Sequence, residues 1–135
     1  MRDEASVLFA NESFYAAFHA RDMAAMRALW AARAAVCCIH PGWNALDGRE
    51  AVLGSWASIM RNPQSPKIRC RSARAYVHGD AALVVCYEVL DGGVLVATNG
   101  FVREDGEWRM VHHQAGPANE LPPEAEPPAS DQQVH

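Results

Sequence analysis

Three residues combine a reactive side chain with an apolar sequence context, and each could take part in proton transfer. His40 ends the apolar run 34–40 and precedes Pro41-Gly42, so a turn would hold its imidazole at the mouth of a cavity. An unperturbed imidazole titrates near neutrality, which suits a general base. His112 and Glu88 lie in predicted strands, and a carboxylate buried there would have a raised pKa and need a partner. His40 is therefore the first candidate for a general base, with His112 and Glu88 as further catalytic candidates.

Each of these residues also has a purely structural interpretation. His40 could cap the end of a strand, and His112 could be a core histidine hydrogen-bonded to a neighbour. Glu88 could lie on a solvated face or pair with an arginine across a dimer, and a single β-bulge would reverse the face that it occupies. The sequence leaves these alternatives open.

The segment 107–117 is the last one with strand character before a proline-rich tail. Alternation places Trp108, His112 and Gln114 on one face of this strand and His113 on the other. We therefore expect Trp108 and Gln114 to line a pocket beside His112. His113 is expected to face solvent or a partner subunit.

Four further residues are candidates for ligand binding. Asn99 lies inside a predicted strand, where asparagine is disfavoured and a polar side chain usually has a hydrogen-bonding role. Trp43 follows a Pro-Gly turn and could close over a ligand. Phe14 and Trp56 lie on apolar helical faces and would supply the apolar wall of the same pocket. A mainly apolar pocket with a few convergent polar groups is typical of small-molecule sites.

Hydrophobic periodicity predicts the elements that must position these residues. Helices are expected at 4–20, after the N-cap Asp22, and after Asp47–Glu50, whose spacing is typical of a capping box. A short strand is expected at 34–40. Turns containing Gly and Asp, typical of hairpins, separate four further strands at about 67–78, 81–90, 94–103 and 107–115. The predicted fold is α+β, with three N-terminal helices packed against a curved antiparallel sheet and a cavity between them.

Length and charge limit the classes of function. The chain has 135 residues, which suits one domain at 1–117 followed by a proline-rich acidic tail at 118–135 that we expect to be disordered. The net charge of −4 comes from four tail acids, since the remainder carries 12 acids and 12 bases. A neutral body gives no electrostatic footprint for nucleic acid. No apolar run is long enough for a membrane helix, and no secretory signal begins the chain, so the expected location is cytoplasmic.

The cysteines give no indication of a metal site. Cys37, Cys38, Cys70 and Cys86 form no C-x-x-C pair, so they lack the paired spacing of zinc ligands. No glycine-rich phosphate loop or H-E-x-x-H pattern is present. We therefore expect reduced cysteines, no metal and no cofactor.

Several motifs in order resemble the NTF2-like superfamily, and within it the SnoaL-like proteins. The resemblance covers residues 4–117 and rests on Phe14–Phe18 with Arg21-Asp22, His40-Pro41-Gly42 with Gly48–Val52, Ala97–Phe101 and Gly106–His113. It implies a cone-shaped NTF2-like sheet with a pocket at its wide end and a homodimer packed through the sheet. The family includes ketosteroid isomerase, polyketide cyclases, dehydratases and non-catalytic association domains, so the fold does not settle the function.

The chain departs from these relatives at positions that matter for chemistry. His40-Pro41 stands about where ketosteroid isomerase keeps its Asp-Pro general base, Phe14 near its oxyanion-hole tyrosine and Asn99 near its neutral acid. A phenyl ring cannot donate a hydrogen bond to an enolate, so we do not expect that specific activity. Gln114 stands where related SnoaL-like proteins often carry a histidine.

Two functions are compatible with these observations. In the first, the protein binds a small apolar molecule and acts as a cofactor-independent isomerase, cyclase or dehydratase, with His40 as base and Asn99 or His112 as hydrogen-bond donor. In the alternative, it is a non-catalytic dimerisation or association module whose exposed sheet face is the functional surface. An open cavity of a few hundred Å³ containing His40 and His112 would favour the first and a filled cone the second. The sequence leaves open whether the protein is an enzyme.

Overall fold

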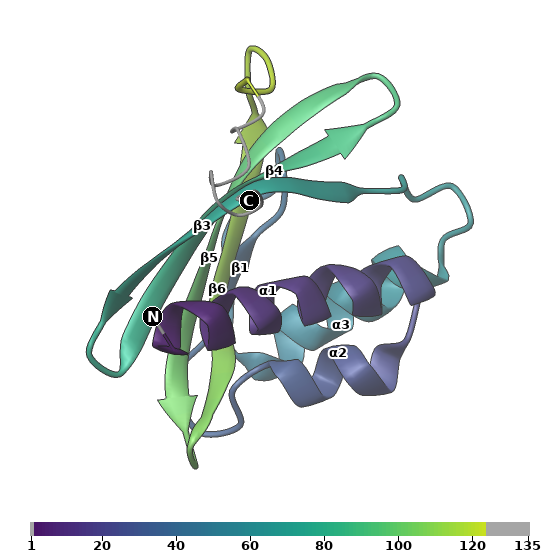
Figure 1. Ribbon diagram of the computed structural model, residues 1–135. Helices are drawn as coiled ribbons and strands as arrows, with labels where there is room; N and C mark the ends of the chain where they lie inside the picture. Colours follow the sequence, from purple (N-terminus) through teal and green to yellow (C-terminus); the bar gives the residue numbers. More distant parts are fainter. Residues whose placement is uncertain (1, 124–135) are drawn as a thin grey trace.

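The structure is a computed structural model that describes residues 2–123. Most of the predicted tail, residues 124–135, lies outside the described residues. The helices are α1 (Arg2–Ala20), α2 (Met23–Leu29) and α3 (Arg49–Arg61). The strands are β1 (Cys37–Ile39), β2 (Leu46–Asp47), β3 (Arg69–His78), β4 (Ala81–Leu90), β5 (Gly93–Glu104) and β6 (Glu107–Pro117). Figure 1 shows their arrangement.

The strands form one curved sheet in the order β2-β1-β6-β5-β4-β3. Strands β3 to β6 are the predicted antiparallel meander. The predicted antiparallel sheet is confirmed for these four strands, while β1 pairs in parallel with β6 and makes the whole sheet mixed. The meander leaves one edge of β6 unpaired, and β1 satisfies the backbone groups of that edge. The two-residue strand β2, which pairs with β1, was not predicted.

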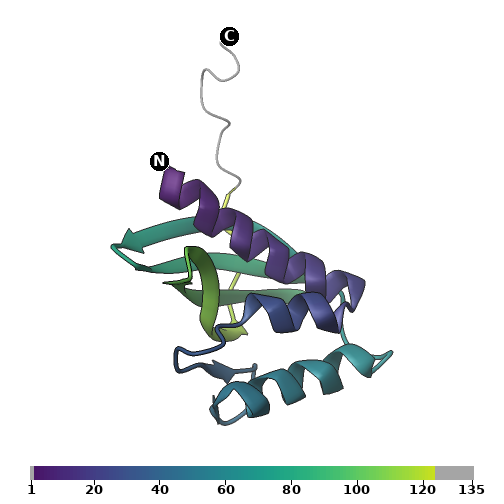
Figure 2. The ribbon, with the colours of Figure 1, turned by 90° about the horizontal axis from the view of Figure 1, so that it is seen from below.

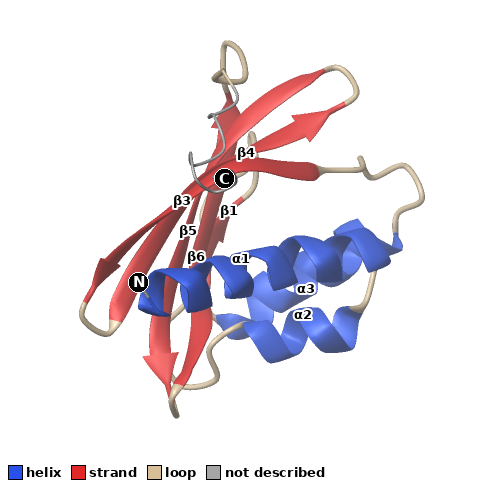
Figure 3. Ribbon diagram, in the orientation of Figure 1, coloured by secondary structure: helices blue, strands red, loops and turns tan. Residues whose placement is uncertain are grey.

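The helices lie on one side of the sheet, as Figure 3 shows by their separation from the strands. Helix α1 contacts β3, β4 and β6, and α3 contacts β1 and β2. Helix α2 packs against both of the other helices, and Figure 2 shows the three side by side from below. Within residues 2–123, no helix has the length and apolar character that crossing a membrane requires.

Of the two predicted helix starts, the structure has the expected cap at α2 but not at α3. The predicted N-cap of α2 is confirmed, since Oδ1 of Asp22 accepts a hydrogen bond from the Ala25 amide at 3.0 Å. The capping box predicted for α3 is wrong. Its N-cap is Gly48, which has a φ of 95° and makes no side-chain cap. Asp47 belongs to β2 instead, so its position is fixed by strand pairing.

A β-bulge in β6 reverses the predicted alternation of that strand. Gly100 pairs with His112 and Phe101 with Met110, so Val111 has no partner in β5. A Cβ atom on residue 100 would lie 3.3 Å from the Cβ of His112, which shows why glycine suits this close approach. The helix-facing side chains are Trp108 and Met110 before the bulge and His113 and Ala115 after it.

The predicted orientations in the second half of β6 were therefore wrong. His112 and Gln114 lie on the outer face of the sheet, away from the helices, and Gln114 is exposed. His113 is buried on the inner face instead of facing solvent. One extra residue moves every later side chain of a strand to the opposite face.

Candidate functional site

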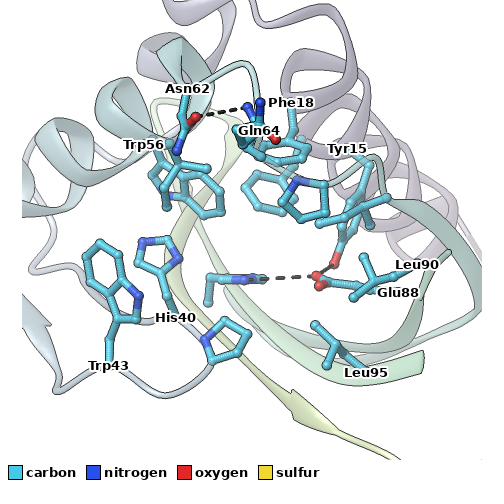
Figure 4. A pocket seen from close by; sticks show the side chains of 17 residues that line it. Tyr15, Phe18, His40, Trp43, Trp56, Asn62, Gln64, Glu88, Leu90 and Leu95 are labelled. Carbon is cyan, nitrogen blue, oxygen red and sulfur yellow. Dashed lines mark hydrogen bonds and ion pairs between the residues drawn. The ribbon is translucent and has the colours of Figure 1, made fainter. Parts of the chain in front are cut away.

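A cavity of about 460 Å³ opens between the helices and the inner face of the sheet. Such a volume is in the range of small-molecule sites. Figure 4 shows His40 and Trp43 on one side of it, and Tyr15, Glu88, Leu90 and Leu95 on the other. The lining is Phe14, Tyr15, Phe18, His40, Pro41, Trp43, Trp56, Ile59, Asn62, Gln64, Ser65, Pro66, Ile68, Glu88, Leu90, Leu95 and His113. This lining is mostly apolar and contains no lysine or arginine.

The structure brings five of the predicted site residues together around this cavity. Phe14, His40, Trp43, Trp56 and Glu88 all contribute to its lining. The rings of Phe14 and Trp56 pack edge to face, with centroids 5.2 Å apart. Trp43 is half exposed and packs against His40 with a centroid distance of 4.7 Å, so it lies where a ligand would enter.

The other four predicted site residues do not line the cavity. Asn99 is fully buried behind the cavity wall. His112 and Gln114 lie on the outer face of the sheet, where the Nδ1 atom of His112 is 3.1 Å from Sγ of Cys37. Trp108 lies on the inner face but before the bulge, beside the first half of α1, where it lines a separate surface groove. His112 therefore cannot act together with His40 and Glu88.

Glu88 is a buried carboxyl group in the cavity wall, with only 2% of its surface exposed. The hydroxyl of Tyr15 donates a hydrogen bond to its Oε2 atom at 2.6 Å. Burial raises the pKa of Glu88, and the Tyr15 hydrogen bond opposes this rise. Burial, followed by the negative charge of Glu88, also raises the pKa of Tyr15 well above its usual value. Tyr15 is thus a neutral donor that holds Glu88 in place.

Asn99 links Tyr15 to His113, one of the two histidines that line the cavity. Its Nδ2 atom donates to Oδ1 of Asn11 at 2.8 Å and to the Tyr15 oxygen at 3.2 Å. Its Oδ1 atom lies 2.6 Å from Nδ1 of His113. A buried asparagine with all of these partners satisfied forms a rigid polar network. The hydrogen-bonding role predicted for Asn99 is present, but it is exercised within the wall and not on the cavity surface.

His113 presents its second ring nitrogen towards Glu88. Its Nε2 atom lies 3.9 Å from Oε2 of Glu88, which is beyond direct hydrogen-bond distance. Burial, aided by the neighbouring imidazoles of His40 and His112, lowers the pKa of His113 to about 3. Since burial disfavours the charged forms of both His113 and Glu88, this contact is not an ion pair at neutral pH.

His40 lies between two tryptophans and is almost completely buried. Its ring centroid is 4.6 Å from that of Trp56, and its Nε2 atom is 2.9 Å from Oγ of Ser55. Burial lowers the pKa of His40 to about 4. The imidazole is therefore neutral at physiological pH and has a low proton affinity, which weakens the hypothesis that it is the general base.

Tyr15, Asn11 and His113 were not predicted to be site residues. Asn11 and Tyr15 are four residues apart and therefore share one face of α1, and both are buried. An asparagine within the apolar stripe of a helix was the available signal for this pair. No comparable signal existed for His113, because its orientation depends on the bulge.

The described part of the chain does not provide a metal site. Among residues 2–123, no group of three or more His, Cys, Asp and Glu side chains is close enough to hold a metal ion. The four cysteines are present as free thiols. The titratable side chains in the cavity lining are Tyr15, His40, Glu88 and His113.

Comparison with known proteins gives relatives of the whole domain. A model of the SnoaL-like domain family matches residues 7–120. A Streptomyces avermitilis protein of the NTF2-like family, provisionally named a dehydratase, is 35% identical over 87% of this chain and 96% of its own, with a TM-score of 0.79. A Thiobacillus denitrificans protein, provisionally named a calcium/calmodulin-dependent protein kinase type II association domain, is 34% identical over 82% of this chain and 93% of its own, with a TM-score of 0.73.

A plant protein also matches most of the domain. The F-box protein SKIP8 of Arabidopsis thaliana is 30% identical over 112 residues, which are 82% of this chain. The match spans about half of the plant protein, 48% of its length. The similarity therefore concerns one part of that protein.

Proposed function

The chain belongs to the SnoaL-like family of the NTF2-like superfamily, and from this membership we propose that it binds a small, mostly apolar molecule and transfers a proton on it without a cofactor. The reaction class is isomerisation, cyclisation or dehydration. The family has members that bind small molecules and members provisionally named as dehydratases and isomerases.

The observation that carries this proposal is the environment of Glu88. Its carboxyl group is buried in the wall of an open cavity, receives one hydrogen bond from Tyr15, and has no lysine or arginine beside it in the lining. An unpaired buried carboxyl group lowers the stability of a fold. A pKa raised towards neutrality is also the property that a general acid–base catalyst requires at physiological pH.

The proposed reaction needs one proton carrier. The Glu88 carboxylate takes a proton from a carbon next to a ligand carbonyl, and the electron pair of that C–H bond moves into the enolate. The resulting carboxylic acid then returns the same proton. Delivery to another carbon gives an isomer, and delivery to a leaving hydroxyl group releases water. Either outcome regenerates the Glu88 carboxylate, so no oxidant, reductant or cofactor is consumed.

Glu88 is a better candidate for this role than His40. A general base works best when its pKa is near the operating pH. Burial moves the pKa of His40 down, to about 4, and moves the pKa of Glu88 up from its ordinary value. We therefore assign proton transfer to Glu88 and ligand contact to His40 and His113.

Hydrogen–deuterium exchange tests this proposal before a natural substrate is identified. The protein would be incubated in D₂O with an uncharged, hydroxyl-bearing bicyclic ketone such as 5-hydroxy-α-tetralone, and deuterium at the carbon next to the carbonyl would be measured by mass spectrometry. We expect catalysed exchange that falls about 10²-fold or more in Glu88→Gln. Glu107→Gln, which changes an exposed glutamate outside the cavity, is the control. Equal exchange by the wild type and Glu88→Gln would remove Glu88 as the proton carrier.

Self-association remains a second candidate function, and a specific surface favours it. Tyr76 on β3 and Leu83 on β4 are paired residues on the outer face of the sheet, and they are 45% and 43% exposed. We propose that this face forms the interface of a homodimer, since an exposed apolar pair is typical of a contact surface. The open cavity favours the ligand-binding function over a purely associative one. Sedimentation of wild type and Leu83→Glu would test the dimer.

A further inference from the structure

The hydrogen bonds around the two cavity histidines determine which ring nitrogens carry a proton. These positions in turn determine what a ligand must offer. The ligand site is the cavity of the proposed function, and no proton transfer there is required.

For His40, the proton lies on Nε2. Oγ of Ser55 is 2.7 Å from the backbone carbonyl oxygen of Val52 and 2.9 Å from Nε2 of His40. Two oxygens approach to 2.7 Å only when a hydrogen lies between them, and the carbonyl cannot donate one. The single hydroxyl hydrogen of Ser55 is therefore given to Val52, and Nε2 of His40 donates to Ser55. A neutral imidazole has one N–H group, so Nδ1 of His40 is a bare acceptor.

For His113, the proton lies on the other nitrogen. The Nδ2 group of Asn99 has two hydrogens, which are donated to Asn11 and Tyr15. Oδ1 of Asn99 is then the atom that faces Nδ1 of His113, at 2.6 Å. This contact requires Nδ1 of His113 to donate. Nε2 of His113 is therefore bare, like Nδ1 of His40.

Both bare nitrogens are available to a ligand. Within residues 2–123, the side-chain nitrogens and oxygens that are both fully buried and without a partner belong to Trp30, Trp56, Ser65 and Trp108. Since neither bare histidine nitrogen is among these atoms, each keeps some accessible surface. The His40 and His113 rings both line the cavity, with centroids 6.2 Å apart, which one bicyclic molecule can span. An oxygen atom could also lie about 2.8 Å from both Nε2 of His113 and Oε2 of Glu88.

The charge of the lining restricts the ligand further. A ligand that binds as an anion would meet two imidazole lone pairs and the carboxylate of Glu88, with no lysine or arginine in the lining to compensate. The enolate of the proposed reaction differs, because Glu88 has taken a proton and is neutral when the enolate forms. A hydroxyl group, in contrast, can donate to either imidazole. We propose that the cavity selects an uncharged, hydroxyl-bearing ring compound, whose hydroxyl groups donate to Nδ1 of His40 and Nε2 of His113, and rejects carboxylates and phosphate esters.

Binding of three matched aromatic probes tests this inference. The probes are β-naphthol, its methyl ether and β-naphthoate, which share one ring system and carry a donor, an acceptor without a donor, and an anion. Quenching of the fluorescence of Trp43 and Trp56, which line the cavity, would report binding. We expect β-naphthol to bind at least about tenfold more tightly than either other probe, because the ether and the anion leave a buried acceptor unpaired.

Variants assign the preference to the imidazoles. His40→Phe and His113→Phe keep a ring and remove the acceptor, so each should reduce the preference for the naphthol over the ether. His78→Phe, at the exposed end of β3, should leave it unchanged. Thermal unfolding would confirm that each variant is folded. Equal affinity for the naphthol and the ether, or tightest binding of the naphthoate, would overturn the inference.

A second measurement needs no variant and no ligand. The ¹⁵N chemical shifts of the histidine side chains distinguish protonated from bare ring nitrogens. We expect Nε2 to be protonated in His40 and Nδ1 in His113, and the opposite assignment at either residue would overturn the inference. Deuterium exchange into 5-hydroxy-α-tetralone, which carries the hydroxyl donor, tests Glu88 separately. A naphthol preference without exchange would keep the ligand class and refute the proton transfer, and exchange without the preference would do the reverse.

Discussion

The hydroxyl of Tyr15 lies 2.6 Å from Oε2 of Glu88 and joins the first helix to the fourth strand across the cavity wall. A short hydrogen bond to a carboxylate is stronger than one between neutral groups. The hydrogen bond from Tyr15 fixes the orientation of Glu88, and few other groups in the cavity stabilise the Glu88 carboxylate. The same phenol accepts a hydrogen bond from Asn99, so one side chain holds both the carboxyl group and the network behind it.

Replacing Glu88 by glutamine should stabilise the protein at alkaline pH. Burial raises the pKa of Glu88 in the folded state, so between its ordinary and raised pKa the folded state binds more protons than the unfolded state. Stability from this group is therefore present at low pH and is lost as the pH rises through that window. We expect the free energy of unfolding of Glu88→Gln to exceed that of the wild type at pH 8 and to match it near pH 4.

Urea denaturation at the two pH values would measure this difference. Glu107→Gln is the matched control, since Glu107 is exposed and should show no such pH dependence. A Glu88→Gln variant that is less stable than the wild type at pH 8 would contradict a raised pKa for Glu88.

The cavity histidines should make the fold sensitive to acid. Burial lowers the pKa of His40 to about 4, so between about pH 6.5 and pH 4 the unfolded state binds the extra proton. Stability from His40 is present above the unfolded pKa and is lost as the pH falls through this window. Between about pH 6.5 and pH 4, His40→Asn should lose less of its free energy of unfolding than the wild type, by a few kcal/mol. His78→Asn, at an exposed position, should leave this loss unchanged.

Arg21 should stabilise the segment that closes one end of the cavity. Its guanidinium donates to the backbone oxygens of Met60 at 2.7 Å, Asn62 at 3.3 Å and Ser65 at 3.4 Å. Arg21→Ala should lower the free energy of unfolding by about 1–3 kcal/mol and speed amide hydrogen exchange at Asn62, Gln64 and Ser65. Arg61→Ala, which changes an exposed arginine at the end of α3, is the control. Unchanged exchange in Arg21→Ala would show that the segment is held by other contacts.

Cys37 should be the first cysteine to react with iodoacetamide in the folded protein. It is partly exposed on the outer face of the sheet, while Cys38 and Cys86 are fully buried. Burial raises the pKa of Cys38 to about 12, and the pKa of Cys70 is raised by its hydrogen bond with Cys86 and by burial. Peptide mass spectrometry after brief labelling at pH 8 would give the order of reaction. Faster labelling of Cys70 would show that the β3 edge opens more readily than the structure indicates.

The fold was predictable because its signals are local. Periodicity and Gly-containing turns gave the four long strands, and Asp22 gave the start of α2, since these features depend on neighbours in sequence. The parallel pairing of β1 with β6 was not predictable in the same way. It joins Cys37 to His112, residues far apart in the chain, and no local pattern encodes such a contact.

The candidate site was predictable only in part. Apolar helical faces selected Phe14 and Trp56, and the preceding Pro-Gly turn selected Trp43. Reactive side chains in an apolar sequence context selected His40 and Glu88, and all five residues line the cavity. Whether any of them acts on a ligand stays a prediction. Tyr15 was not selected, because the sequence around a tyrosine in the apolar stripe of a helix does not show whether its hydroxyl makes a hydrogen bond or its ring only packs in the core.

The sequence by itself determined the order of the three helices, of β1 and of the four long strands, the family motifs and the presence of a polar group at Glu88 inside an apolar strand. The tertiary structure alone decided which histidine of the His112-His113 pair faces the cavity. Which face each side chain of a strand occupies depends on how the strand pairs with its neighbour. The unpaired Val111 shifts that assignment by one residue for the rest of β6. The shift occurs where β6 passes Gly100 of the neighbouring strand, so it is set by contact between strands and not by the local sequence of β6.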